Sequence, residues 1–428
     1  MANDYQSNIN KKLLKSFTKG MESSSVLMNT VSSQLVNDFD ASTGGDYGQV
    51  SMKRPAQYVP QRTSDGDMTA QSTNPIKVGK VQAEVSDYIT VYVENTQVEE
   101  ALEADQLDQL LAPIAEDMVV TCESELAMFM AKNGSLISGD PDQAISKWSD
   151  VAQAGSLMKE LGVPAGKSYA AISSFDEVSL ADLQTQLGVN PNVNEAWANA
   201  VIKERFAGFN QVLTTNNLPE YTTGGTGAGP ITLSATPAST YTTYKDTYRM
   251  TLTMTGLNNG SSLVAGQTLT IDASEDIFLV NQRNRKTVRN RGTAIPLTVT
   301  VLEDATADGS GNIQVVVSGA AIFEAGVNGA FNTVSAALAS GQTVTINGTV
   351  NTTYRPSLFY QEGFVGMGSV VLPKLHATDS MIINHKGKSI RVHKFSDGVG
   401  NKNRYRFDLL PTFACFNPFW GGQLFGQS

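Results

Sequence analysis

Residues 114–134 read IAEDMVVTCESELAMFMAKNG and carry the clearest local pattern in the chain. Apolar side chains recur there at helical spacing, which predicts a buried stripe along one α-helix. The stripe consists of Met118, Val119, Cys122, Leu126, Phe129 and Met130. Asn133-Gly134 is a typical helix end. Upstream, Thr96-Gln97-Val98-Glu99 is a capping box that predicts a helix start, and Pro113 either kinks this helix or opens a second segment.

Two strand-like segments precede the helix, at about 50–59 and 80–94, and a polar connection joins them. The second is rich in β-branched and aromatic residues, and at about 3.3 Å per residue it would span roughly 50 Å. We therefore predict a long two-stranded arm with a polar tip, which needs a further surface because a lone hairpin is marginally stable in water. Residues 8–37 predict short amphipathic helices, whose apolar face needs a partner in this chain or another.

Residues 145–220 alternate between helix and strand patterns. We expect a helix capped by Ser149 and ending near 161, a strand at 169–172, helices at 176–187 and 194–203, and a strand at 209–214.

A glycine-rich linker, TTGGTGAGP at 222–230, marks a change in composition. From there to about 353 the chain is rich in threonine and valine, with short strand patterns at 249–255, 268–271, 297–302, 313–317 and 343–346. This spacing predicts a small β-barrel or sandwich of about 130 residues. An apolar segment at 358–375 and a hairpin pattern at 389–395 and 404–410 follow, so we expect that one domain interrupts another.

Length and charge limit the classes of protein to consider. The 428 residues predict two or three packed units, and the formal net charge of −10 argues against a nucleic-acid-binding or membrane-surface protein. Cys122 and Cys415 give no disulfide framework and are expected to be buried free thiols in a reducing cytoplasm. No apolar run is long enough for a signal peptide or a membrane span, so we expect neither secretion nor membrane insertion.

Motifs that carry chemistry were compared with their required spacing. Gly166-Lys167-Ser168 lacks the spacing of a phosphate-binding loop and predicts a turn. Residues 304–312, DATADGSGN, begin like a calcium loop, but Val315 stands where the bidentate carboxylate is needed, so a hairpin turn is predicted. Three histidines show no zinc-binding spacing: His376, His385 and His393. No nucleophile elbow occurs, and we expect no catalysis, cofactor or metal.

A basic run lies inside the β-rich region. It consists of Arg283, Arg285, Lys286, Arg289 and Arg291. Three interpretations stay open: a solvated loop, pairing with carboxylates of a neighbouring subunit, and nucleic-acid contact. The acidic character of the chain favours pairing over polyanion binding.

The order of these elements resembles the Hong Kong 97-type capsid fold of tailed phages and herpesviruses. More specifically, the sequence is similar to coat proteins of short-tailed phages of Salmonella and Shigella, in which an inserted β-barrel, the I-domain, interrupts this fold. The similar stretches are KRP at 53–55, residues 79–93, LAP at 111–113, KWSDVAQ at 147–153, LPKLH at 372–376, IRVHK at 390–394 and RFDLLP at 406–411.

The resemblance implies an α+β fold with named parts. By position these are an N-terminal arm at 1–45, an E-loop at 46–95, a P-domain spine helix at 96–144, an A-domain at 145–222 and 354–387, an inserted β-barrel (I-domain) at 223–353, and P-domain strands at 388–428. It also implies a major capsid protein that forms hexamers and pentamers of an icosahedral head, assembled in the host cytoplasm. The implied partners are a scaffolding protein, a portal protein and double-stranded DNA enclosed without sequence-specific binding, with no membrane.

Charged residues are the candidate contacts between subunits. On the arm they are Arg54, Arg62, Asp65 and Asp67; in the β-rich region they are Arg283, Arg285 and Arg289. The resemblance adds a loop near 238–246 that reaches a neighbouring capsomer, with Lys245 and Asp246 available for ion pairs. Two other functions were considered: a surface or secreted adhesion protein with a β-barrel binding module, and a hydrolase with a β lid. The first predicts a targeting signal and the second a nucleophile or metal constellation.

Overall fold

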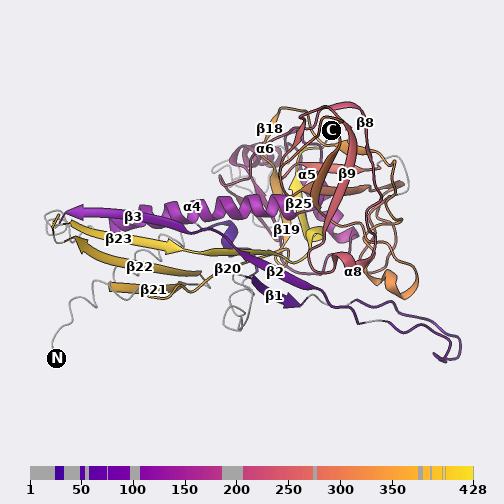
Figure 1. The fold of residues 1–428 in the computed structure, drawn as a ribbon, viewed down its shortest axis with the longest axis horizontal. Helices are drawn as coiled ribbons and strands as arrows, with labels where there is room; N and C mark the ends of the chain where they lie inside the picture. The colour runs from indigo at the N-terminus through magenta and orange to yellow at the C-terminus, as the bar shows by residue number, and fades with distance from the viewer. Residues whose placement is uncertain are drawn as a thin grey trace. The chain divides into compact units, whose positions relative to one another are not determined.

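The computed structural model describes residues 25–32, 49–53, 57–74, 76–96, 107–185, 206–272, 277–374, 379–385, 388–397, 399–400 and 402–427 (Figure 1). The chain divides into two compact units. The first comprises Met1–Val50, Ala83–Ala127 and Val365–Ala414, and the second comprises Ser51–Gln82, Met128–Phe364 and Cys415–Ser428. No helix among these described ranges is long and apolar enough to cross a membrane.

The first unit is built around a four-stranded antiparallel sheet with the order β21-β22-β23-β3. The strands are β21 (Asp379–His385), β22 (Lys388–Asp397), β23 (Lys402–Leu409) and β3 (Ile89–Thr96). The predicted hairpin is confirmed, since β22 pairs with β23 from Ile390↔Leu409 to Asp397↔Lys402. Alternate residues such as Val392 and Phe407 are fully buried, as expected for a sheet with one apolar face.

The prediction of one long strand over 80–94 is wrong. The segment forms two strands, β2 (Lys80–Val85) and β3, which belong to different sheets. The sheet that contains β2 has the order β1-β2-β24-β20. Its other strands are β1 (Gln49–Lys53), β24 (Pro411–Cys415) and β20 (Val365–Ser369). The strand opposite is interrupted at the matching position: β3 pairs with β23, which ends at Leu409, and β2 pairs with β24, which begins at Pro411. Proline has no N–H for a ladder, so continuous pairing ends there, although the Pro411 carbonyl still accepts from Ser86 N.

Helix α4 (Leu107–Asn133) is the predicted long helix, and it continues through Pro113 without a second segment. Thr96 ends strand β3, while Glu99 of the expected capping box lies outside the described residues. Cys122 is a buried free thiol, as predicted, and burial raises its pKa to about 12. Cys415 forms no disulfide and is only half-buried, where a buried thiol was predicted.

The described part of the N-terminal region, residues 25–32, finds its partner surface within its own unit. The Glu123 carboxylate of α4 is fully buried and accepts from Val26 N at 2.5 Å and Met28 N at 3.2 Å. Leu27, the first residue of the short 3-10 turn Leu27–Asn29, is fully buried. A carboxylate with two backbone donors therefore fixes this segment to the helix.

The second unit contains a five-stranded sheet with the order β4-β25-β19-β5-β6. Its strands are β4 (Leu136–Ser138), β25 (Gly421–Leu424), β19 (Ser357–Gln361), β5 (Ser168–Ile172) and β6 (Gln211–Thr214). Helices α5 (Trp148–Glu160) and α6 (Ser174–Thr185) are close to their predicted ranges, while the helix predicted at 194–203 lies outside the described residues. The expectation that Ser149 caps α5 is wrong: the buried Asp150 carboxylate accepts from the backbone N–H groups of Ser146 and Lys147 at 3.0 and 2.9 Å.

A six-stranded antiparallel sheet follows in the same unit, with the order β17-β11-β14-β16-β9-β8. The strands are β8 (Gly227–Leu233), β9 (Arg249–Leu257), β11 (Thr268–Ile271), β14 (Leu297–Val301), β16 (Ile313–Ser318) and β17 (Val344–Ile346), and five of them match predicted strand positions. Its two outer strands meet through a bridge between Thr232 and Thr343 and a bond from Leu233 N to Gln342 O. The sheet thus closes on itself, which removes its edges.

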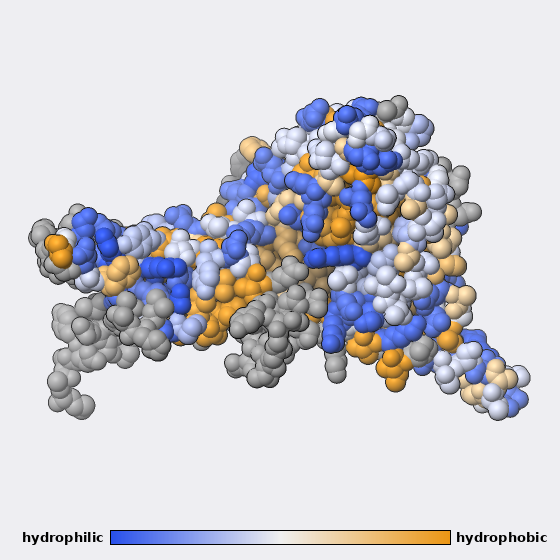
Figure 2. Space-filling model, viewed as in Figure 1, coloured by the Kyte–Doolittle hydropathy of each residue, from blue (hydrophilic) through white to orange (hydrophobic). Residues whose placement is uncertain are grey.

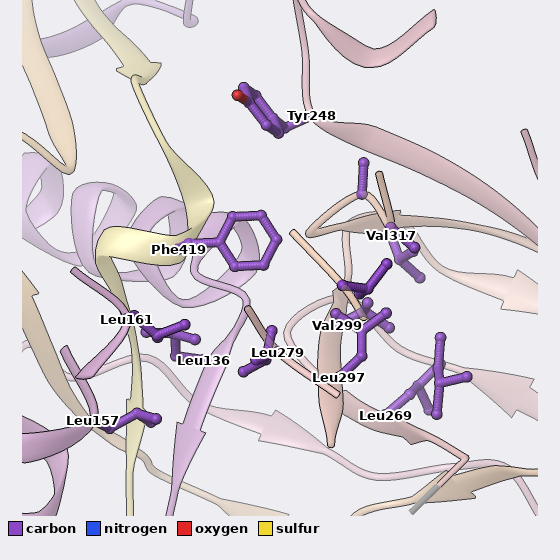
Figure 3. Packing of buried hydrophobic residues seen from close by; sticks show 14 of the residues in the cluster. Leu136, Leu157, Leu161, Tyr248, Leu269, Leu279, Leu297, Val299, Val317 and Phe419 are labelled. Atoms are coloured by element: carbon purple, nitrogen blue, oxygen red, sulfur yellow. The ribbon is translucent and has the colours of Figure 1, made fainter. Parts of the chain in front are cut away.

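One apolar core runs through the second unit. Leu297, Val299 and Val317 from the six-stranded sheet belong to the same buried cluster as Leu157 of α5 and Phe419 near the C-terminus (Figure 3). The chain that forms β8 to β17 leaves after β6 and returns before β19. The two sheets therefore share a core, although the segment is inserted in sequence.

Buried hydroxyl groups attach the six-stranded sheet to the end of α4. Thr300 and Thr298 of β14 donate to the carbonyls of Gly134 (2.6 Å) and Ser135 (2.7 Å). Ser318 of β16 donates to Asn133 O at 2.7 Å. These carbonyls belong to the last residue of α4 and the two residues after it, where no intrahelical donor remains. The hydroxyls therefore satisfy acceptors that would otherwise be buried without partners.

We expect Thr300→Val to lower the free energy of unfolding by about 1–3 kcal/mol, because the isosteric side chain leaves the buried Gly134 carbonyl without its donor. Thr300→Ser keeps the hydroxyl and serves as the control. Urea unfolding of the full-length subunit measures both variants. Destabilisation by serine but not by valine would show that the methyl group, not the hydroxyl, matters.

Candidate assembly surface

The segment at 57–79 between β1 and β2 is the most exposed long stretch that the structure describes. None of residues 57–74 is buried, and four large apolar side chains of the segment are exposed by 37–77%: Tyr58, Met68, Ile76 and Val78. In Figures 1 and 2 it leaves the body of the second unit as two adjacent traces with blue and orange side chains mixed along them. Exposed apolar side chains on an extended segment are typical of a surface that another chain covers.

Asn74 fixes the base of this loop. Its side chain accepts from Val59 N at 3.1 Å and donates to Val59 O at 3.0 Å. Gln61 also donates to Ser72 O. The two sides of the segment are thus held together by amide side chains, where the sequence had predicted a regular strand up to residue 59.

Three of the predicted contact residues lie on this loop: Arg62, Asp65 and Asp67 are all exposed. Asp65 accepts from Asp67 N at 3.1 Å, and Asp67 accepts from the backbone and hydroxyl of Thr69, which hold the pKa of Asp67 below its ordinary value. These hydrogen bonds therefore favour the charged form of Asp67 on the tip of the loop. Arg54 lies outside the described residues.

Lys245 and Asp246 lie at the base of the same segment. They form an ion pair with each other at 2.8 Å, and Asp246 also accepts from Lys80 N at 2.8 Å. Gly79 packs so closely that an added Cβ would lie 2.0 Å from Lys245 O. Nearby, Lys77 Nζ lies 3.7 Å from Glu324. The structure therefore uses both predicted contact residues within the chain to set where the loop leaves the body.

The basic run is divided between backbone bonds and solvent. Arg285, at φ +59°, is half-buried and donates to Ala330 O through Nε (3.2 Å) and Nη2 (2.9 Å). Arg289 donates to Gly292 O at 3.1 Å in the turn between β12 (Arg289–Asn290) and β13 (Thr293–Ala294). The Arg283 side chain is exposed. Arg285 thus shapes its own loop, and Arg283 is free of such bonds to the described residues.

A buried polar cluster in the first unit escaped the sequence analysis. Asp408 is fully buried and accepts from Arg391 Nη2 (2.9 Å), Arg406 Nε (2.7 Å) and Thr90 Oγ1 (2.8 Å). His393 lies 3.9 Å from Asp408 through Nε2, while its Nδ1 is 2.7 Å from Ser380 Oγ. In the sequence, charged residues stand among apolar ones at position 391 of β22 and positions 406 and 408 of β23. That these three side chains meet depends on the register between the two strands, which the sequence does not give.

This cluster contains the residue types of a hydrolytic triad. Ser380 is only 8% exposed, His393 1% and Asp408 0%, so a substrate has no access to the hydroxyl. Two arginines already neutralise the aspartate that would orient the histidine. The arrangement stabilises the sheet and does not resemble a nucleophile with its base.

The rejected motifs form turns. Gly166-Lys167-Ser168 follows α5 and leads into β5. In residues 304–312, Asp308 accepts from the N–H groups of Ser310 and Asn312 at 2.8 and 2.9 Å, which makes a tight turn before β16. Over the described ranges, no group of three or more histidine, cysteine or acidic side chains has the geometry of a metal site.

The exposed loop at 57–79, with apolar and charged side chains mixed, is a surface that another chain could cover. Residues 1–426 match a family described as P22 coat protein - gene protein 5. A curated relative, "Major capsid protein" of Acyrthosiphon pisum secondary endosymbiont phage 1, is 42% identical over 430 residues and covers 100% of both chains. The chain therefore belongs to the P22 coat protein family: it is a phage major capsid protein, a structural component of the virion shell.

Solved structures give more distant likenesses. A chain of Mycobacterium phage Che8 has a TM-score of 0.43 at 9% identity, with 93% of this chain and 90% of that chain covered. The capsid of Ralstonia phage GP4 has a TM-score of 0.42 at 8% identity, with 90% and 85% covered. The assignment depends on the family match and the curated relative, which also exclude the adhesion protein considered above.

Proposed function

We propose that this capsid protein assembles through residues 46–95, acting as an E-loop that lies over an adjacent subunit in hexamers and pentamers of an icosahedral head. The observation that carries the proposal is the exposure of residues 57–74, none of which is buried in its own chain. Burial of Tyr58, Met68 and Ile76 against a neighbour would supply affinity at about 25 cal/mol per Å² of apolar surface. The charged residues Arg62, Asp65 and Asp67 would select partner and register.

The remaining parts of the proposed capsid fold follow the chain order. Residues 1–45 would be the N-terminal arm, 96–144 the spine helix region, 145–222 and 354–387 the A-domain, 223–353 the I-domain and 388–428 the P-domain strands. Support for the I-domain comes from the closed sheet of β8 to β17, which is inserted between strands of one five-stranded sheet. The described units divide after Phe364, so β20 lies in the same unit as β22 and β23.

The proposed partners follow from the resemblance of the chain to short-tailed phage coat proteins of Salmonella and Shigella. They are a scaffolding protein, a portal protein and enclosed double-stranded DNA. The net charge of −10 supports a shell that encloses DNA without binding its sequence, because an acidic subunit repels the phosphate backbone.

Loop replacement tests the proposal. We expect that replacing residues 61–72 by a short glycine-serine linker abolishes closed shells, while the subunit keeps its unfolding midpoint, because Asn74 and Val59 already close the loop base. Electron microscopy and sedimentation measure shells, and urea unfolding measures the fold. A matched control inserts the same linker between Gly309 and Ser310 in the exposed turn before β16. Normal shells from the loop replacement would refute the proposed role of the E-loop.

A further inference from the structure

A hollow of about 480 Å³ lies in the second unit between the end of α5, the turn at 162–166 and the loop at 281–284. Its size suits a ligand or a few residues of a peptide. Two cations line it, Lys159 and Arg283, and no carboxylate of the described part of the chain does. Both cationic side chains are exposed, in a chain of net charge −10.

The amide side chains around the hollow present donors. Asn210 Oδ1 accepts from Ser168 N at 3.0 Å, Asn284 Oδ1 accepts from Lys286 N at 2.9 Å, and Gln361 Oε1 accepts from Gly363 N at 2.6 Å. These three oxygens already accept within the chain, so the NH₂ groups are the polar atoms through which the three side chains would meet a ligand. Asn281, the fourth amide of the lining, donates to Glu160 O instead. A carboxylate only accepts hydrogen bonds, and it matches a site made of amide donors and two cations.

The backbone carbonyls at the end of α5 do not offset the positive charge of Lys159 and Arg283. Glu160 O accepts from Asn281 Nδ2 at 2.5 Å and Leu161 O accepts from Gln282 N at 2.9 Å. The turn bonds of Gly162 and Val163 occupy the carbonyls of Lys159 and Met158. The acceptors that end α5 are thus satisfied, and the polar character of the hollow is set by its donors.

We infer that this hollow binds the Asp65-Gly66-Asp67 tip of the loop at 57–79 of a second copy of the chain; the inference depends on the proposed E-loop function. Asp65 and Asp67 are exposed, and hydrogen bonds lower the pKa of Asp67. The tip is not among the residues that line the hollow of its own chain. Met68, 52% exposed, follows them and suits the apolar wall of Met158, Val163 and Pro164. Charge and apolar complementarity therefore coincide over four consecutive residues.

Charge reversal on each side tests the contact. The assay is binding of a peptide spanning residues 57–74 to the unassembled full-length subunit. We expect the double variant Lys159→Glu, Arg283→Glu of the subunit to weaken this binding by tenfold or more, because like charges would face each other. The double variant Asp65→Lys, Asp67→Lys of the peptide should weaken it by the same amount for the same reason. Combining the two reversals should restore binding to within about threefold of wild type. Fluorescence anisotropy of the labelled peptide at low salt measures the affinity. Lys286→Glu, an exposed cation outside the hollow, is the control.

Shell formation separates this inference from the proposed function. In cells that supply the other head proteins, both single-side reversals should reduce shells and the combined variant should recover them. If loop replacement abolishes shells but the combined reversal restores neither binding nor assembly, the hollow is not the receptor and the E-loop role stands. If the reversed hollow instead loses affinity for a double-stranded DNA fragment while peptide binding is unchanged, the site is a phosphate contact and the inference is wrong.

Discussion

Asp408→Asn is expected to lower the free energy of unfolding by about 3–5 kcal/mol, because it removes the charge that neutralises a buried arginine. Arg391, with its side chain 9% exposed, donates to Asp408 through Nε and Nη2 and reaches no other carboxylate among the described residues. The substituted amide would also direct an NH₂ group at these donors or at Arg406. Urea unfolding of the full-length subunit at neutral pH measures the loss.

The matched control is Asp397→Asn on the turn of the same hairpin, where the side chain is only partly buried and an amide oxygen can still accept from Val399 N and Gly400 N. We expect little change there. A similar loss for both variants would show that acidic charge in the hairpin matters generally, and that the buried position does not.

The pH dependence of this effect has a defined sign. Burial raises the pKa of Asp408, but hydrogen bonds from Arg391, Thr90 and Arg406 outweigh it, so the pKa is lowered overall. A lowered carboxyl pKa gives stability that is present above the unfolded value near 3.9 and is lost as pH falls through the folded value. The difference between wild type and Asp408→Asn should therefore shrink below about pH 4. Burial lowers the pKa of His393, so protonation of this residue favours the unfolded chain. It therefore reduces stability as pH falls below about 6.5, which is a higher pH than that at which Asp408 acts.

Local patterns predicted the elements, while the sheets depend on pairing that no single segment encodes. The period of 3.6 residues located α4, and the β-branched runs located β9, β11, β14, β16 and β17 within a few residues. The same reasoning joined β2 and β3 into one strand, because composition does not reveal that Pro411 interrupts the partner strand. Closure of the barrel likewise depends on contact between β8 and β17, which are more than one hundred residues apart.

The candidate site shows the same division. Polarity and length identified the loop at 57–79 as an interaction segment, and the structure finds it exposed. Lys245 and Asp246 were expected to face a neighbouring capsomer, but their bonds to each other and to Lys80 are made within the chain, so their role between subunits stays a prediction. The hollow could not be predicted, since Lys159, Arg283 and Gln361 meet only after folding.

Gly422→Ala should have an effect as large as the loss of Asp408, for a steric reason. Gly422 pairs with Leu136 of β4 on one side and Phe359 of β19 on the other, so it lies inside the five-stranded sheet. An added Cβ would lie 1.9 Å from Leu136 O and 2.5 Å from Leu136 C, both backbone atoms in a strand that cannot move without disturbing the core. We expect a loss of about 3 kcal/mol or more in the free energy of unfolding.

Gly229→Ala makes the same chemical change in β8 with nothing within 4 Å of the new Cβ, and it should leave stability nearly unchanged. Unfolding midpoints in urea at low temperature, where a weakened subunit still accumulates, compare the two variants. If Gly422→Ala unfolds at the midpoint of Gly229→Ala, β25 and β4 do not approach as closely as described. If only Gly422→Ala is weakened, close contact between β25 and β4 is required to join the C-terminal strand to the end of α4, and the docking of the barrel on that helix end depends on the same contact.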